Sequence, residues 1–471
     1  MIKPPYPRDL TGYGAHAPHA RWPGGARIAL QFVINYEEGG ENCILHGDAA
    51  SEAFLSEMIG AAPRAGQRNM NMESIYEYGS RAGFWRLHRM FTRRKIPATV
   101  FGVATALQRS PDAVAAMQEA GWEIASHGLK WIDYGDVPRG TERAHIAEAV
   151  RLHAEVTGAR PLGFYQGRAS EATLALTMAD GGFLYSADSY ADDLPYWVEG
   201  PKSPHLIVPY TLDANDMRFA VAQGFNSGDQ FYTYLKDSFD VLYEEGAQAP
   251  KMLSIGLHCR LVGRPGRAAA LARFIDNAKA RDKVWFARRI DIARHWIAHH
   301  PPPGGHRPEH MSKALFVERF GGVYEHSPWV AARAYDAGLG AEANSPDGLA
   351  KAMAAAMAGA SDAEKRALIN SHPDLAGKLA LSKNLTRDST EEQASAGLGS
   401  LSPAELTRFT ALNDAYKKKF GFVFIMAVRG AAKQDILDAF ERRLKNSEAQ
   451  EFAEALTQID KIARLRLTQL M

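Results

Sequence analysis

The chain has 471 residues, 46% of them hydrophobic and 23% charged, which is typical of a folded globular protein too long for a single ordinary core. Its 55 basic and 54 acidic side chains leave a net charge of +1, without the basic excess of proteins that bind nucleic acids or anionic membranes. The two cysteines, Cys43 and Cys259, exclude a disulfide framework or a thiolate metal cluster and favour a reducing compartment.

The sequence also predicts a compartment and a class of partner. The N-terminal stretch "MIKPPYPRDLTGYG" has prolines and charges where a signal peptide has its apolar core. No apolar run approaches the roughly 20 residues that span a bilayer. We therefore expect a cytoplasmic protein with small-molecule substrates and without nucleic-acid or membrane partners. We also expect a homo-oligomer.

The first 300 residues alternate between short apolar runs and amphipathic segments. The apolar runs predict strands at residues 27–36, 98–104, 122–127, 162–166, 183–188, 206–212, 252–258 and 284–288. Helical periodicity lies between several of them, at residues 81–94, 112–120, 142–156, 171–179 and 267–279. This alternation predicts an α/β fold with a parallel sheet, of a size that permits closure into a barrel.

Polar side chains follow four of the expected strands. Glu37 and Glu38 come directly after the first strand, and His127, Arg168 and His258 end or follow three others. Catalytic residues of parallel α/β folds gather at the carboxyl ends of the strands. Each residue alone also fits an ordinary polar turn or surface ion pair. Their shared position on separate strands favours a site.

These residue types permit more than one chemistry. An adjacent pair of carboxylates can supply a general base or bind a cation, and a histidine can be a base, a metal ligand or a structural group. Arg168 can clamp a carbonyl or oxyanion, or form a salt bridge. A metal site of this kind requires a second histidine four residues after His127, but that position holds Trp131. In "IGLHCRLVGRPGR", His258, Arg260 and Arg264 stand among glycines, which suits either close approach to a ligand or a basic surface loop.

The clearest boundary in the chain is the stretch "AHHPPPGGHRPEH", because proline and glycine sustain neither a helix nor a strand. We place the first domain at residues 1–300, a linker at 301–311 and a second domain at 312–471. The second domain lacks strand-like alternation and is amphipathic throughout. Ser345, Ser361 and Ser402 are expected to cap three of its helices. An all-α bundle is predicted.

Two motifs and one helix face stand out in the second domain. In "SHPDLAGKLA", His372 precedes a rigid proline, which suits an oriented proton donor or a simple capping turn. "STEEQASAGL" reads equally as a capping box. Counting 100° per residue from Phe452, Arg466 falls at about 320°, inside the apolar stripe, and Arg464 at about 120°, outside it. A buried arginine needs an ion pair or a ligand unless it snorkels from the helix end.

The N-terminal motifs resemble the polysaccharide-deacetylase-like family over about residues 5–300. They include "YPRDLTGYG", "WPGGARIALQFVINYEEGGEN", "ESIYEYGSRAGFWRL", "SHGLKWIDY", "ADDLPYW" and "IGLHCRLVGRPGR". The usual family pattern is Asp-Asp with His-x-x-x-His around a divalent metal. Glu37-Glu38 and His127 with Trp131 look instead like the allantoinase branch, which is metal-independent and opens the hydantoin ring of allantoin. The resemblance implies a distorted (β/α) barrel and no cofactor.

Ring opening needs a base for water, an oxyanion donor and an acid for the leaving nitrogen. We assign Glu37 to the base position and His258 to the acid or oxyanion donor. Glu38, His127, Trp131 and Arg168 are expected to line the substrate. We also expect Glu38 to lie beside His127 and to favour its imidazolium form, in partial replacement of a metal's charge.

The C-terminal motifs resemble the decarboxylase family that acts on 2-oxo-4-hydroxy-4-carboxy-5-ureidoimidazoline (OHCU). They are "YEHSPWVA", "HPDLAGK", "STEEQASAGL", "LNDAYKKKFGFVFIMAVRG" and "IARLRL", over residues 312–471. Val423 stands where proline is usual. The resemblance implies a helical bundle without a cofactor, with His372 as the acid–base residue beside Glu392 and Arg466. It implies a substrate lining of Pro373, Ser389, Thr390, Glu391, Gln393, Phe424, Ile425, Met426, Ala427 and Val428.

The two resemblances describe consecutive steps, because the decarboxylase makes S-allantoin and the allantoinase consumes it. We therefore expect a bifunctional enzyme of urate degradation. The alternative is a metal-dependent polysaccharide or peptidoglycan deacetylase with a non-catalytic helical oligomerisation module, and the missing histidine at position 131 disfavours it.

Overall fold

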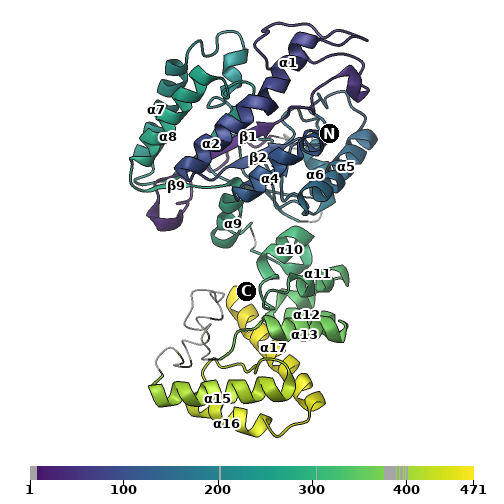
Figure 1. Ribbon diagram of the computed structural model, residues 1–471, viewed down its shortest axis with the longest axis vertical. Helices are drawn as coiled ribbons and strands as arrows, with labels where there is room; N and C mark the ends of the chain where they lie inside the picture. The colour runs from purple at the N-terminus through teal and green to yellow at the C-terminus, as the bar shows by residue number, and fades with distance from the viewer. Residues whose placement is uncertain are drawn as a thin grey trace, which may run out of the picture. The chain divides into compact units, whose positions relative to one another are not determined.

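The computed structural model describes residues 8–200, 203–303, 305–375, 389, 392, 396, 398 and 401–471. The chain divides into two compact units, Met1–Gly304 and Gly305–Met471 (Figure 1). None of the helices among the described residues is long and apolar enough to cross a membrane. Thr390, Glu391 and Gln393, three of the expected substrate-lining residues, lie outside the described part of the chain.

A nine-stranded sheet forms the centre of the first unit. Its strands are β1 (Ile28–Tyr36), β2 (Thr99–Gly102), β3 (Glu123–Ser126), β4 (Gly163–Phe164), β5 (Tyr185–Ser186), β6 (Tyr196–Val198), β7 (His205–Ile207), β8 (Lys251–His258) and β9 (Val284–Phe286). They run in the order β6-β7-β5-β4-β3-β2-β1-β8, and β9 also pairs with β1. Of the strand pairs in the described part of this unit, β6–β7 is antiparallel and the others are parallel. The sheet curls into a half-barrel, which confirms the predicted distorted barrel.

Helices cover this sheet (Figure 1). They are α1 (Met70–Tyr78), α2 (Phe84–Arg94), α3 (Ala104–Arg109), α4 (Pro111–Glu119), α5 (Arg139–Thr157), α6 (Thr173–Asp180), α7 (Gly228–Glu245), α8 (Pro265–Lys279) and α9 (Arg289–His299). All eight expected strands and all five expected helices of this unit are present. The elements β6, α1, α3, α7 and α9 were not predicted. A π-helical turn, Gly79–Gly83, joins α1 to α2.

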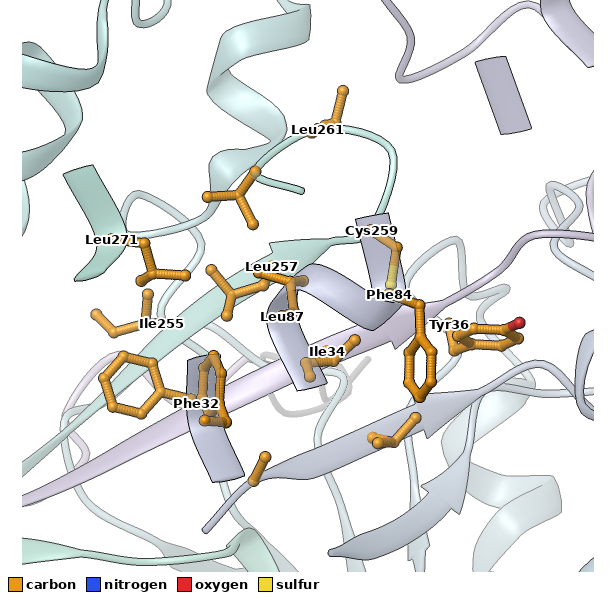
Figure 2. Packing of buried hydrophobic residues seen from close by; sticks show 14 of the residues in the cluster. Phe32, Ile34, Tyr36, Phe84, Leu87, Ile255, Leu257, Cys259, Leu261 and Leu271 are labelled. Carbon is orange, nitrogen blue, oxygen red and sulfur yellow. The ribbon is translucent and has the colours of Figure 1, made fainter. Parts of the chain in front are cut away.

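Strand β1 is buried on both faces, and its two faces differ. Ile28, Leu30, Phe32, Ile34 and Tyr36 point into the main apolar core. Figure 2 shows the last three together with Ile255 and Leu257 of β8 and Phe84 and Leu87 of α2. Each such side chain contributes roughly 1.5–3 kcal/mol when fully buried. This core holds the strand ends that carry the site.

The opposite face of β1 carries buried polar side chains. Gln31 accepts a hydrogen bond of 2.9 Å from Arg289, which also donates to Ser254 at 2.8 Å. Asn35 donates to the Tyr210 hydroxyl at 3.1 Å. Because side chains alternate along a strand, one strand supplies both an apolar core and a hydrogen-bonded polar interior.

The second unit is helical throughout its described part, as predicted. Its helices are α10 (Lys313–Phe320), α11 (Pro328–Asp336), α12 (Pro346–Ala358), α13 (Asp362–Ser371), α15 (Pro403–Phe420), α16 (Lys433–Arg443) and α17 (Glu448–Leu470). Ser345, Ser361 and Ser402 cap α12, α13 and α15 through their hydroxyl oxygens, which confirms all three expected caps. Helix α17 packs against α12, α13 and α15, so its buried face lies at the centre of the bundle.

Candidate active sites

A cavity of about 540 Å³ lies at the carboxyl ends of the strands in the first unit. Glu37 follows β1, His127 follows β3, Arg168 follows β4 and His258 ends β8, and all four line this cavity with Trp131. Parallel pairing sets their positions: Asn35 is in register with His258, and Tyr36 with Gly102 of β2. The fold therefore brings together the residues that the sequence predicted at separate strand ends.

Glu37 is the centre of this site and is 1% exposed. Its Oε1 lies 3.4 Å from His127 Nε2 and 3.3 Å from His258 Nε2, while its Oε2 accepts a 2.6 Å hydrogen bond from Arg260. Burial favours the protonated carboxyl, but the charges of Arg260 and His258 and the histidine hydrogen bonds outweigh it. They hold the pKa of Glu37 well below its usual range. Glu37 is ionised at neutral pH.

His258 is oriented by Asp216, a residue that the sequence analysis missed. The Asp216 carboxylate accepts from His258 Nδ1 at 2.6 Å and from the His258 backbone N–H at 2.8 Å. Burial opposes a charged imidazole, yet Glu37 and Asp216 together raise the pKa of His258 to about 9. His258 is therefore a proton donor at neutral pH. Asp216 follows residues 213–215, which show no strand or helix pattern, and it belongs to none of the motifs identified in the sequence.

The structure corrects the expected partner of His127. Glu37, not Glu38, lies beside His127. Glu38 turns away from the cavity: its Oε1 accepts from the Arg260 backbone N–H at 3.2 Å and from the Arg260 guanidinium at 3.5 Å. The cause is the turn after β1, which sends two consecutive side chains in different directions. Arg260, for which the sequence left open either close approach to a ligand or a basic surface loop, is thus a central residue of the site.

Trp131 and Arg168 form one wall of the cavity. The Trp131 ring stacks on Phe54 with centroids 5.8 Å apart, and the Arg168 guanidinium lies 5.5 Å from the Trp131 ring centroid and 5.4 Å from that of Phe54. Arg168 Nη2 donates to Asp133 at 3.4 Å, whereas its buried Nη1 has no hydrogen-bond partner. This wall offers an apolar face and one free N–H donor to a ligand.

These residues do not fit a divalent metal. Glu37 is already engaged by Arg260 and two histidines, Glu38 faces Arg260, and Trp131 carries no ligand atom. Within the described residues, no group of three histidine, cysteine or acidic side chains is arranged to hold a metal ion.

The second unit buries Arg466 of α17 at 2% exposure. Its Nε and Nη2 donate to the two carboxylate oxygens of Glu392, both at 2.9 Å. Its Nη1 donates to Glu325 at 2.9 Å, and the Ser389 hydroxyl lies 3.2 Å from Nη2. Arg464, two residues earlier, is exposed and pairs with Asp347 at 2.7 Å. The helical-face prediction that separated these two arginines is confirmed, and the arginine is fully paired, not snorkelling.

Glu325 is a charged residue of this cluster that the sequence analysis did not single out. It accepts hydrogen bonds from Arg466 and, at 3.0 Å, from the Ser389 hydroxyl. Glu325 lies within the motif "YEHSPWVA", and its place in that motif is the sequence feature from which it could have been identified. The Ser389 hydroxyl therefore contacts both Glu325 and Arg466, which are distant in the sequence.

His372 is the C-cap of α13 and is 8% exposed. Burial lowers the pKa of His372 to about 4, with Glu325 opposing that shift and Arg466 adding to it. Its Nε2 is buried without a hydrogen-bond partner. His372 is therefore neutral at pH 7, with one ring nitrogen free for a ligand.

A small cavity lies beside His372. Its lining includes Pro373, Ser389, Glu392, Phe424, Ile425, Met426 and Val428, all of them expected from the sequence. Ala427 is absent from the lining, and its N–H donates to Gln458 at 3.0 Å. Among the described residues, Leu375 and Ile462 also line this cavity, and they were not expected.

Fold and site together define two enzyme-like units. The first is an α/β half-barrel with a polar cluster at its strand ends, and the second is a helical unit with a buried cluster of arginine, carboxylate and histidine side chains.

Family models match each part: polysaccharide deacetylase at residues 71–179 and OHCU decarboxylase at residues 309–468. A putative polysaccharide deacetylase of Schizosaccharomyces pombe is 44% identical over 313 residues, which cover 62% of this chain and 98% of that protein.

The second unit has a comparable relative. An OHCU decarboxylase of Halalkalicoccus jeotgali is 44% identical over 158 residues, which cover 34% of this chain and 86% of that protein. A solved structure of Puue allantoinase is 63% identical and covers 63% of this chain and 98% of that one, with a TM-score of 0.62. The chain thus belongs to the polysaccharide deacetylase family over its first unit and to the OHCU decarboxylase family over its second.

Proposed function

We propose that the chain is a bifunctional enzyme of urate degradation. The second unit decarboxylates OHCU to S-allantoin, and the first unit hydrolyses the hydantoin ring of allantoin to allantoate. The observation that carries the proposal is the contact, in one cavity, between Glu37 Oε1 and His258 Nε2 at 3.3 Å. Neighbouring charges lower the pKa of Glu37 and raise the pKa of His258 to about 9, which suits a base and an acid. The 63% identity to an allantoinase supports this choice among the hydrolyses of the family.

In the first unit, water attacks a ring carbonyl held against the Trp131 wall. Glu37 accepts the proton of the attacking water, and its orientation is set by Arg260 and both histidines. The low pKa of Glu37 makes it a weak base. His258 therefore carries more of the catalysis: it donates to the developing oxyanion or to the leaving nitrogen. The free Nη1 of Arg168 is placed to bind a carbonyl oxygen of the substrate.

In the second unit, Glu392 lines the cavity and binds the ureido N–H groups, while Arg466 holds the Glu392 carboxylate in place through two hydrogen bonds. Loss of CO₂ leaves electron density on a carbon that the adjacent ring delocalises. Neutral His372 first accepts the proton that the substrate hydroxyl gives up, and then returns a proton to one face of the ring. Delivery from a single face accounts for one enantiomer of the product.

The test is an enantiomer-resolved assay of both steps on the purified full chain, with wild type, His372→Ala and Glu37→Gln. We expect His372→Ala to lose stereoselective decarboxylation and to keep hydrolysis, and Glu37→Gln to do the reverse, each by roughly 10²–10⁴-fold. Loss of both activities in either variant would contradict two independent sites.

Metal dependence is tested on the same protein. We expect chelator treatment to leave ring hydrolysis unchanged, because Glu37 and Glu38 face Arg260 and Trp131 replaces a ligand. If metal-stripped enzyme lost hydrolysis and added Zn²⁺ or Mn²⁺ restored it, the metal-free mechanism would be wrong.

A further inference from the structure

Arg260 is a fully buried cation between two adjacent carboxylates. It is 0% exposed, and its Nη2 donates to Glu37 at 2.6 Å while its Nη1 lies 3.5 Å from Glu38 Oε1. Each end of the guanidinium therefore faces a different member of the acidic pair. Isolated charges are not buried in proteins without such compensation.

Further contacts hold Arg260 in this place. Its Nε donates to the Leu55 carbonyl at 2.8 Å. The rings of Tyr76 and Trp131 lie against it, with centroids 4.2 Å and 5.3 Å away. The backbone N–H of Arg260 also donates to Glu38 at 3.2 Å. The head group is thus fixed on its edges and its faces.

From this geometry we propose that Arg260 is a tethered cation that bridges Glu37 and Glu38, supplies the positive charge that this buried acidic pair requires, and so excludes a divalent metal ion from the pair. Trp131 takes part in two ways, since it brings no ligand and it covers the guanidinium. The inference goes beyond the proposed function, because it concerns the charge balance of the acidic pair and not the substrate.

The physical consequence concerns the pair without its cation. Removing the guanidinium leaves two buried carboxylates side by side, with His127 and His258 within 3.4 Å of Glu37 and a vacated space between the acids. Such a pair must take up a proton or another cation. Carboxylate oxygens together with an imidazole are ligands that Mn²⁺ accepts.

The experiment is titration of metal-free full-length protein with Mn²⁺, followed by calorimetry and by the paramagnetic signal of free Mn²⁺, without substrate. We expect no saturable site in the wild type and about one Mn²⁺ per chain in Arg260→Ala. Arg260→Lys, which keeps the charge, is expected to behave as the wild type. Arg168→Ala is the matched control, since it removes another arginine of the same cavity but one that contacts neither Glu37 nor Glu38.

The second mutation that decides the proposal is Glu38→Gln in the Arg260→Ala background, which is expected to abolish the new Mn²⁺ site. If folded Arg260→Ala bound no more Mn²⁺ than the wild type, or if the double variant still bound it, the proposal would be overturned. Should Arg260→Ala not fold, Arg260→Met keeps most of the volume without the charge. A melting temperature for it that is unchanged by Mn²⁺ would overturn the proposal equally.

Because these readouts use no substrate, a negative result here and a failure of the proposed reactions are distinguishable. If metal-free wild type did not hydrolyse allantoin, the proposed function would fail but this inference would stand. If the wild type bound Mn²⁺ tightly at Glu37 and Glu38, this inference would be overturned.

Discussion

His258 and His372 are both buried, yet their neighbours set them in opposite protonation states at neutral pH. Burial would lower the pKa of His258, but Glu37 and Asp216 raise it to about 9. Burial lowers the pKa of His372 to about 4, because one glutamate, Glu325, is opposed by Arg466. A charged donor suits hydrolysis and a neutral acceptor suits decarboxylation.

Ring hydrolysis should therefore fall as the pH rises through about 9, where His258 loses its proton. The stabilising interaction of charged His258 is fully present below its ordinary pKa of roughly 6.5 and is lost over the same rise. Asp216→Asn removes one of the two anions, so the alkaline limb should move to lower pH in a profile of kcat/KM. An alkaline limb that Asp216→Asn leaves in place would show that another group titrates.

Glu325 is expected to act as a positioning residue for Arg466 and Ser389. Glu325→Gln should lower kcat/KM for decarboxylation about tenfold to a hundredfold, which corresponds to about 1.4–2.7 kcal/mol of transition-state stabilisation. Glu325→Asp should restore part of the kcat/KM for decarboxylation and shift the acid limb of its pH profile. A variant that had merely lost its fold would do neither. Arg464→Ala is the control on the same helix and should change nothing, because that arginine is exposed.

At the scale of elements, the segment from α1 to α2 fixes the acidic pair from outside the sheet. The π-helical turn brings Gly79 against the Glu38 carboxylate and Gly83 against the Cys259 carbonyl, with no space at either for a Cβ atom. Such turns recur at functional sites. Here the turn seats a helix directly on the loop that carries Arg260.

Gly83→Ala should therefore destabilise the first unit by about 2–3 kcal/mol, since its new methyl group overlaps backbone that cannot move freely. It should also weaken ring hydrolysis by displacing the loop with Arg260. Gly140→Ala in the first turn of α5 is the matched substitution, because no atom lies within 4 Å of its added Cβ. Urea unfolding measures both, and equal stabilities for the two variants would refute this role of the turn.

At the scale of the whole molecule, two cores lie on one chain. The first unit has the cluster around β1 and β8, and the second buries its own apolar residues on α12, α15 and α17. Of the eight tryptophans, only Trp329 lies after residue 304. Tryptophan fluorescence thus reports mainly on the first unit, and far-ultraviolet circular dichroism on both.

Urea unfolding of the full chain should consequently depart from a single two-state transition. Leu257→Ala in β8 should move the fluorescence transition by roughly 2–5 kcal/mol, and Met353→Ala in α12 should leave it unchanged while moving part of the circular dichroism signal. A common shift of both signals by either variant would indicate one cooperative unit.

Much of the fold followed from pattern alone. Residues 252–258 form a mostly apolar run, and the helix at residues 403–420 begins at a capping box of Ser402 and Glu405, so local physics specifies both. Helix α7 was missed although Ser227 caps it and Phe231, Leu235 and Phe239 share its buried face. Strand β6 was missed because this edge strand has only three residues. Tertiary packing decides such segments.

By itself the sequence determined the parallel α/β architecture, the helical second unit and the residue types at both sites, because hydrophobic periodicity and the position of polar residues at strand ends are local properties. It also separated Arg466 from Arg464 by helical geometry. Only the tertiary structure decided that Glu37 and not Glu38 contacts His127, that Asp216 orients His258, and that Arg260 lies between the acids. Those pairings join residues far apart in the chain, and a side chain's direction after a strand depends on the packing that surrounds it.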